Sequence, residues 1–138
     1  MSQTIASKSY AINHVQEYIK AIDGIFVEYT SDKFAVIIPL QSSKRIQRVF
    51  GTFKYNKDII EFSSVVCTKE KVDFEKLSEA QSDLTYSKFI KDGDNVIISA
   101  SVSIEYSNYF LIQDVIMEVA QNADSWEKRL TGMDLYEI

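Results

Sequence analysis

Residues 95–130 constrain the fold of this chain more than any other stretch of its sequence. Over residues 95–106 small polar side chains alternate with apolar ones, which are Val96, Ile98, Ala100, Val102, Ile104 and Tyr106. Because successive side chains of a strand point to opposite faces, this alternation predicts a strand with one buried face. Apolar residues then recur at helical spacing, at Tyr109, Ile112, Ile116, Val119, Ala123, Trp126 and Leu130. A strand and a long helix with one apolar stripe must therefore pack together or against a partner.

Upstream of this pair, hydrophobic spacing predicts one helix followed by four strands. The helix has one apolar face, formed by Ile12, Val15, Tyr18, Ile19 and Ile22. Residues 1–8 are expected to be frayed, with Ser9 as a cap, and Gly24 is expected to end the helix in a left-handed conformation. The turns between the strands are short enough for antiparallel hairpins, and the strands are expected over residues 25–30, 33–40, 45–55 and 58–68.

A short helix and one more strand complete the expected order. Asp73 is placed to cap a helix that carries Phe74, Leu77 and Ala80, and residues 84–91 return to strand spacing before the Asp92-Gly93 turn. Gly132 is expected to stop the long final helix. The whole chain, residues 1–138, is predicted to be one α+β domain with an antiparallel sheet of five or six strands. We expect helices on the inner face of this sheet and polar side chains on its outer face.

Composition excludes several classes of function. The chain of 138 residues has a formal net charge of -5, and such an acidic surface opposes binding to nucleic acid or to anionic lipid. No apolar run approaches the roughly 20 residues that cross a bilayer, and residues 1–8 lack the apolar block of a signal peptide. With a single cysteine, which cannot form an internal disulfide, the sequence predicts a cytoplasmic protein.

No catalytic, metal-binding or cofactor-binding constellation is present in the sequence. His14, the one histidine, falls off the apolar stripe of the first helix and is expected to be a solvated surface residue. Cys67 has no histidine partner, so a structural or weakly reactive thiol is expected. Residues 92–95 lack the closing glutamate of a calcium loop, and no glycine-rich phosphate loop precedes a helix. We therefore nominate no catalytic residue, metal or cofactor and expect a protein that is not an enzyme.

Four residues are candidates for contact with a protein partner. Lys44, Arg45 and Arg48 form the densest basic cluster. Such a cluster is either a solvated strand face that blunts edge pairing or a surface for an acidic protein. Trp126 lies on the stripe of the final helix and is expected to pack on the sheet or across a subunit boundary.

Three segments resemble the YbjN-like family, whose members share the type III secretion chaperone-like fold. They are residues 44–49 before a strand, residues 119–130 in the final helix and residues 131–134 after it. The resemblance covers nearly the whole chain. It implies a non-enzymatic, protein-binding module and supplies no catalytic residues.

Two functions therefore lead, with a small enzyme of unknown chemistry as a third. In the first, the chain is a YbjN-like binding or regulatory protein. In the second, it is a type III secretion-type chaperone that holds an unfolded segment of an exported effector. A homodimer is also expected. The 8 Phe, the 8 Tyr and the long apolar stripe of the final helix are more apolar surface than one small sheet is expected to cover.

Overall fold

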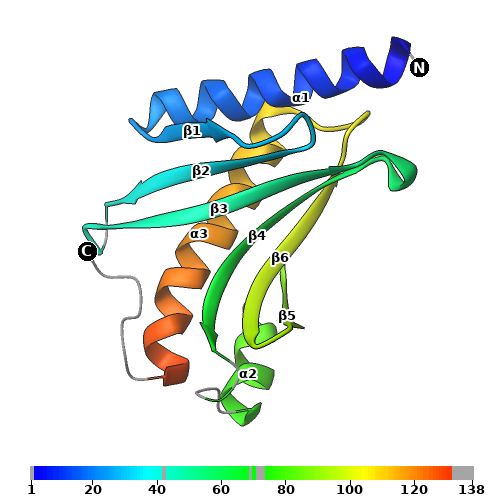
Figure 1. The fold of residues 1–138 in the computed structure, drawn as a ribbon. Helices are drawn as coiled ribbons and strands as arrows, with labels where there is room; N and C mark the ends of the chain where they lie inside the picture. The colour runs from blue at the N-terminus through cyan, green and yellow to red at the C-terminus, as the bar shows by residue number, and fades with distance from the viewer. Residues whose placement is uncertain (1, 42, 69, 71–73, 132–138) are drawn as a thin grey trace.

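The computed structural model describes residues 2–41, 43–68, 70 and 74–131, which form three helices, six strands and one turn of 3-10 helix (Figure 1). Their order along the chain is α1 (Ser2–Ala21), β1 (Ile25–Glu28), β2 (Lys33–Leu40), β3 (Arg45–Lys54), η1 (Tyr55–Lys57), β4 (Ile59–Thr68), α2 (Phe74–Gln81), β5 (Lys88–Asp92), β6 (Asn95–Ser103) and α3 (Tyr109–Thr131). The predicted α+β class and order of elements are confirmed.

All six strands belong to one sheet, in the order β1-β2-β3-β4-β6-β5. Every neighbouring pair is antiparallel, and β1 to β4 form the expected meander. The hairpin of β5 and β6 then folds back, so that β6 pairs with β4 and leaves β5 at the edge. The turn of that hairpin contains Gly93 with a φ of 59°, a conformation that glycine adopts at little cost.

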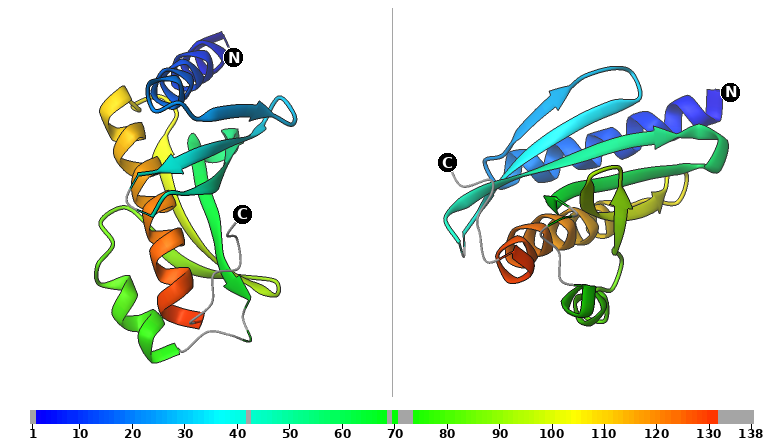
Figure 2. Two further views of the ribbon diagram at one scale, coloured as in Figure 1. Left: turned by 90° about the vertical axis from the view of Figure 1, so that its left-hand side faces the viewer. Right: turned by 60° about the horizontal axis from the view of Figure 1, so that its bottom comes forward.

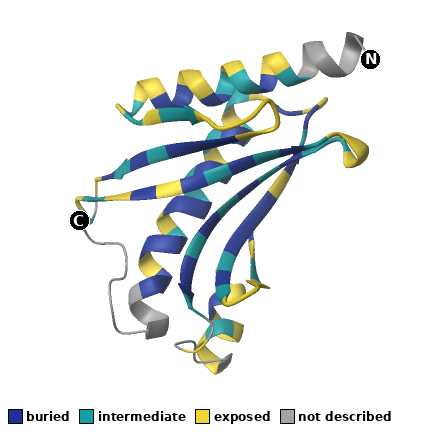
Figure 3. Cartoon of the chain, in the orientation of Figure 1, coloured by how far each residue is buried: buried dark blue, intermediate teal, exposed yellow. Residues whose placement is uncertain are grey.

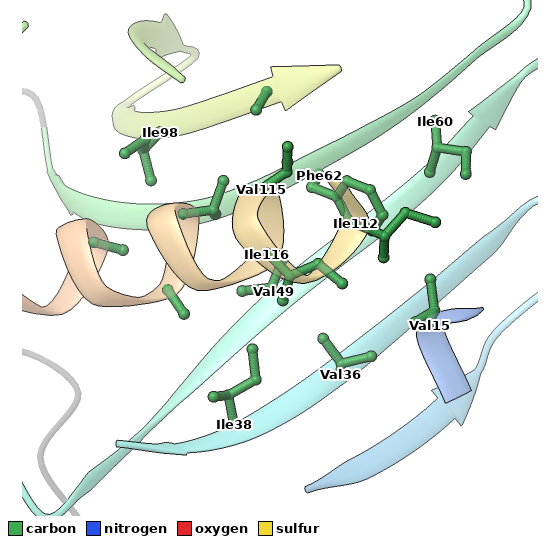
Figure 4. Close-up of a cluster of buried hydrophobic side chains, with 14 of the residues drawn as sticks. Val15, Val36, Ile38, Val49, Ile60, Phe62, Ile98, Ile112, Val115 and Ile116 are labelled. Carbon is green, nitrogen blue, oxygen red and sulfur yellow. The ribbon is translucent and has the colours of Figure 1, made fainter. Parts of the chain in front are cut away.

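Helices α1 and α3 lie on the same face of the sheet (Figures 1 and 2). Helix α3 crosses β3, β4 and β6, whereas α1 packs against β1 and against α3. The hydrophobic core lies between these two helices and the sheet, and it includes Phe62 of β4, Ile98 of β6, and Ile112 and Ile116 of α3 (Figure 4). The apolar stripe of the final helix is therefore buried from Ile112 to Trp126.

The ends of α1 differ from the expectation. The helix begins at Ser2, so residues 2–8 are helical and Ser9 is not its cap. At its other end Asp23 adopts the left-handed conformation, with a φ of 58°, and Gly24 does not. Asp23 N–H and Gly24 N–H donate to the carbonyls of Lys20 and Ile19, which closes the last turn. Gly24 is needed for close approach instead, because a Cβ there would lie 2.7 Å from the Ile37 carbonyl oxygen.

Three strands are shorter than predicted by two residues or more, and the first is β1, which ends at Glu28 and not at residue 30. β5 begins at Lys88 because the N–H groups of residues 85–87 bind the carboxylate of Glu118. β6 ends at Ser103, so Tyr106 does not continue its buried face and is instead exposed. The predicted cap Asp73 and the predicted stop Gly132 lie outside the described residues.

Burial alternates along the strands, as Figure 3 shows clearly for β3. The outer face is polar in the middle of β4 and β6, where Glu61 pairs with Ser101 and Ser63 with Ser99. Toward one end of these strands Val65 pairs with Ile97 on the same face. On β1, β2 and β3 the same face carries apolar side chains. The expectation of a polar outer face is therefore wrong for this half of the sheet.

Candidate protein-binding surface

The apolar half of the outer face forms a surface that we call the strand patch. Cross-strand register places its members together: Ile25 pairs with Ile37, Ile46 with Pro39, and Val27 lies in the same row as Phe50. Tyr29 stacks on Phe50, with 6.4 Å between ring centroids. The strand patch consists of Ile25, Val27, Tyr29, Ile37, Pro39, Ile46 and Phe50.

Three members of the strand patch are well exposed. Ile25 is 58% exposed, Tyr29 52% and Ile46 40%. Neither α1 nor α3 covers this face (Figure 2). Isolated apolar side chains are common on protein surfaces, but a contiguous group on one sheet face is typical of an interaction site.

The sequence contains a signal for this surface. β2 is apolar at almost every position from Phe34 to Leu40 rather than at alternate positions. A strand of this composition has apolar side chains on both faces, which indicates that both faces are to be covered. In β2 one face packs on the core through Phe34, Val36 and Ile38, and the other bears Ile37 and Pro39.

Alternate residues of β3 point to opposite faces of the sheet, and this separates the residues of the predicted basic cluster. Arg48 pairs with Ile37 on the outer face and is exposed, so it lies next to the apolar members of the strand patch. Lys44 is exposed in the turn before β3, with a φ of 58°, and its N–H donates to the Leu40 carbonyl. These two cations give the strand patch a basic margin.

Arg45 points to the opposite face, toward α3. Its Nε donates to Asp124 Oδ1 at 2.9 Å, and its Nη2 lies 2.8 Å from the same oxygen. Both side chains are largely buried, so the pair fastens β3 to α3. Arg45 is therefore separated from Lys44 and Arg48 and is not positioned for a partner on the strand patch.

Trp126 is buried within the subunit. It lies on α3 and meets Phe89 of β5 edge to face, with 6.5 Å between ring centroids. The sequence suggested that Trp126 packs either on the sheet or across a subunit boundary, and its contact with Phe89 places it on the sheet. Phe89 brings the edge strand into the core, and Trp126 anchors it.

The two candidate reactive groups are not arranged for chemistry. Cys67 is buried beside a register shift in β4, and burial first, then the nearby Glu127, raises the pKa of its thiol. His14 is largely buried between α1 and α3, which corrects its predicted surface position. The described residues contain no cluster of three or more His, Cys, Asp or Glu side chains that could hold a metal ion.

A cleft of about 340 Å³ opens where α1, the end of β2 and α3 meet. Its apolar lining includes Ile22, Leu40 and Met117, with Asp23 among its polar residues. Pro39 belongs both to this cleft and to the strand patch. A concave site with a mixed apolar and polar lining, next to a flatter apolar surface, can accept an anchoring side chain of a bound segment.

The chain matches no protein-family model and no curated protein. Among solved structures it is similar to a chain from the structure of the HopA1-SchA chaperone-effector complex. The similarity covers 93% of this chain and 98% of that one, with a TM-score of 0.62 and 5% sequence identity. The fold is that of a secretion chaperone.

A chain from the crystal structure of the ExsC-ExsE complex is also similar to this chain, with a TM-score of 0.55. It is 10% identical, and the similarity covers 90% of this chain and 96% of that chain. In the described residues, no helix has the length and apolar character needed to cross a membrane.

Proposed function

We propose that this protein is a secretion-type chaperone that binds a segment of an exported protein through the strand patch. The observation that carries the proposal is the exposure of Ile25, Tyr29 and Ile46 on one sheet face that no described helix covers. The fold supports it, since a similar chain occurs in a chaperone-effector complex. The protein acts in the cytoplasm without a cofactor or a catalytic residue.

The surface specifies the chemistry of the bound segment. Covering an exposed Ile or Tyr side chain contributes about 1.5 to 3 kcal/mol, before the cost of ordering the partner. Arg48 and Lys44 at the margin favour acidic side chains in that partner. The segment is therefore expected to be apolar with interspersed Asp or Glu and to place one side chain in the cleft beside Pro39.

The YbjN-like reading remains a prediction from sequence resemblance. It shares protein binding but gives the chain a binding or regulatory role, which does not require an unfolded segment in the partner. The chaperone proposal requires instead that the bound segment is not folded by itself. The state of the bound segment thus distinguishes the two functions.

Capture from native lysate tests the proposal when it is paired with variants. Ile25→Asp with Ile46→Asp places charge in the strand patch, and Tyr86→Asp changes an exposed residue outside it. Mass spectrometry should find one protein that wild type and Tyr86→Asp retain and the double variant loses. Limited proteolysis of that protein should show a bound segment that is protected only in the complex. Equal capture by all three baits, or a bound region that resists protease when free, would reject the proposal.

A further inference from the structure

The most exposed large apolar side chains lie away from the strand patch, near the start of α3. Tyr106 is 76% exposed, Phe110 74% and Tyr10 62%. Tyr10 is on α1 and Phe110 on the first turn of α3. Figure 1 shows that the start of α3 lies against α1. Three exposed rings near one helix junction form a surface that the folding of a single subunit does not require.

Ring contacts join the two helices. Tyr10 meets His14 at 4.5 Å between centroids, His14 meets Tyr109 at 6.1 Å, and Tyr109 meets Phe110 at 5.6 Å. Neither ring nitrogen of His14 has a hydrogen-bond partner in the part of the chain that the structure describes, so its imidazole acts as one ring of the row. We call Tyr10, His14, Tyr109 and Phe110 the aromatic patch. Its edge-to-face packing holds the exposed rings in place before any partner binds.

Carboxylates flank the rings on both helices. On α1, Glu17 is exposed and lies 3.9 Å from His14 Nδ1. On α3, Asp114 is exposed one turn after Phe110. Burial, then the neighbouring Tyr109 and Asp114, raise the pKa of Tyr18 to about 12, which places Asp114 close to this junction. Each helix therefore presents a ring followed by an acid.

Few cations compete for these carboxylates. From residue 109 to residue 127, α3 contains Asp114, Glu118, Asp124 and Glu127 but no Lys or Arg. On α1, Lys8 is directed elsewhere, because its ammonium lies 5.2 Å from the Phe53 ring centroid and donates to the Ser31 carbonyl. Lys20, in the last turn of α1, comes three residues after Glu17 and is the cation nearest to Glu17 along that helix. Along residues 109–127 of α3 the flank of the aromatic patch is therefore acidic, opposite in sign to Lys44 and Arg48 beside the strand patch.

We infer that the aromatic patch is a second docking surface, for a protein segment in which Arg or Lys alternates with apolar side chains. The cations stack on the ring faces of Tyr10 and Phe110 and pair with Glu17 and Asp114. The apolar side chains cover the ring edges. This site differs from the strand patch in place and in charge, so the two sites bind different segments, of one partner or of two.

Two hexapeptides test the inference by calorimetric titration: alternating Leu and Arg, and alternating Leu and Glu, each with blocked ends. The Leu-Arg peptide should bind the wild type, and Tyr10→Ala with Phe110→Ala should weaken it about tenfold or more, as for a truncated hot spot. Tyr86→Ala, which removes an exposed ring elsewhere, should leave the affinity unchanged. NMR signals of Tyr10, Tyr109 and Phe110 should shift on binding.

Three results would overturn the inference. They are no binding of the Leu-Arg peptide, equal binding of the Leu-Glu peptide, and equal affinity of the double variant and wild type. The last would mean that only net charge attracts the peptide. The strand-patch variant, Ile25→Asp with Ile46→Asp, should bind the Leu-Arg peptide as wild type does. The proposals for the strand patch and for the aromatic patch can therefore be rejected independently of each other.

Discussion

Single residues fasten the elements of this protein together, and Glu118 is one of them. Its carboxylate accepts N–H groups from Thr85, Tyr86 and Ser87 and the Ser87 hydroxyl. Burial by itself would raise the pKa of Glu118, but these donors, the Ser87 hydroxyl foremost, hold the pKa below its ordinary value. The loop before β5 is thereby held to α3 by one ionised side chain.

Replacing Glu118 by Gln should lower the free energy of unfolding at neutral pH by about 1 to 3 kcal/mol, because the amide cannot accept all these bonds. Since the folded-state pKa is depressed, the carboxylate stabilises the protein above its unfolded pKa, and this stabilisation is lost as pH falls through the folded pKa. Urea unfolding over a pH series should show the gap between wild type and variant closing in acid. Glu79→Gln, an exposed control, should change little at any pH; a gap that stays constant with pH would contradict the account.

Trp126 and Phe110 provide a matched pair on α3. Trp126→Ala removes a buried ring from its contact with Phe89 and should cost about 3 to 5 kcal/mol. Phe110→Ala removes an exposed ring and should cost about 0.5 kcal/mol or less. Denaturant titration of both variants measures the difference. Similar losses would mean that the orientation of α3 on the sheet is wrong.

The sequence predicts the burial of a residue correctly when that burial depends only on the helix or strand to which the residue belongs. The stripe of α3 predicts the burial of Trp126 correctly. By contrast, His14 is buried because α3 crosses α1 beside it, and Arg45 is separated from Arg48 because alternate residues of β3 face different layers. The spacing of Arg45 and Arg48 contains that second signal, since a separation of three puts two strand residues on opposite faces.

At the scale of elements, a side chain of β2 packs over a glycine of β3. Gly51 of β3 pairs with Phe34, and a Cβ at Gly51 would lie 2.1 Å from Phe34 Cζ. The buried Phe34 ring therefore lies over a position that has no side chain. Glycine is required here for space and not for a left-handed backbone.

Gly51→Ala should destabilise the protein by about 1 to 3 kcal/mol, as overpacking does. Shortening the ring by Phe34→Leu should recover part of this loss, with a coupling of about 0.5 kcal/mol or more between the two changes. Thermal unfolding of the single and double variants measures that coupling. Additive effects would show that the ring and Gly51 are not in contact.

The elements are more predictable from this sequence than their arrangement. Hydrophobic periods predict all three helices and six strands, and the Asp92-Gly93 turn predicts the β5-β6 hairpin. No local pattern states that β6 pairs with β4, because that choice depends on long-range packing under α3. The strand patch was missed since the alternation of β6 suggested a polar outer face for the whole sheet, whereas β2 is apolar on both faces.

For the whole molecule, self-association remains a prediction. The stripe of α3 is buried within one subunit, so a second copy would have to cover other exposed apolar side chains. Light scattering after size exclusion, over a range of concentrations, should give about twice the subunit mass of 15.8 kDa. The subunit mass at every concentration would exclude a homodimer and leave protein binding by the monomer.

Cross-linking from the strand patch tests the central claim most directly. A photoreactive benzoylphenylalanine at Ile46, or at Tyr86 as a control, is introduced into the full chain in its native cells, and cross-linked peptides are sequenced. The account predicts that Ile46 links to neighbouring positions in one apolar, acidic segment of an exported protein and that Tyr86 does not. Links from Ile46 only to a second copy of this chain, or no more links than from Tyr86, would contradict it.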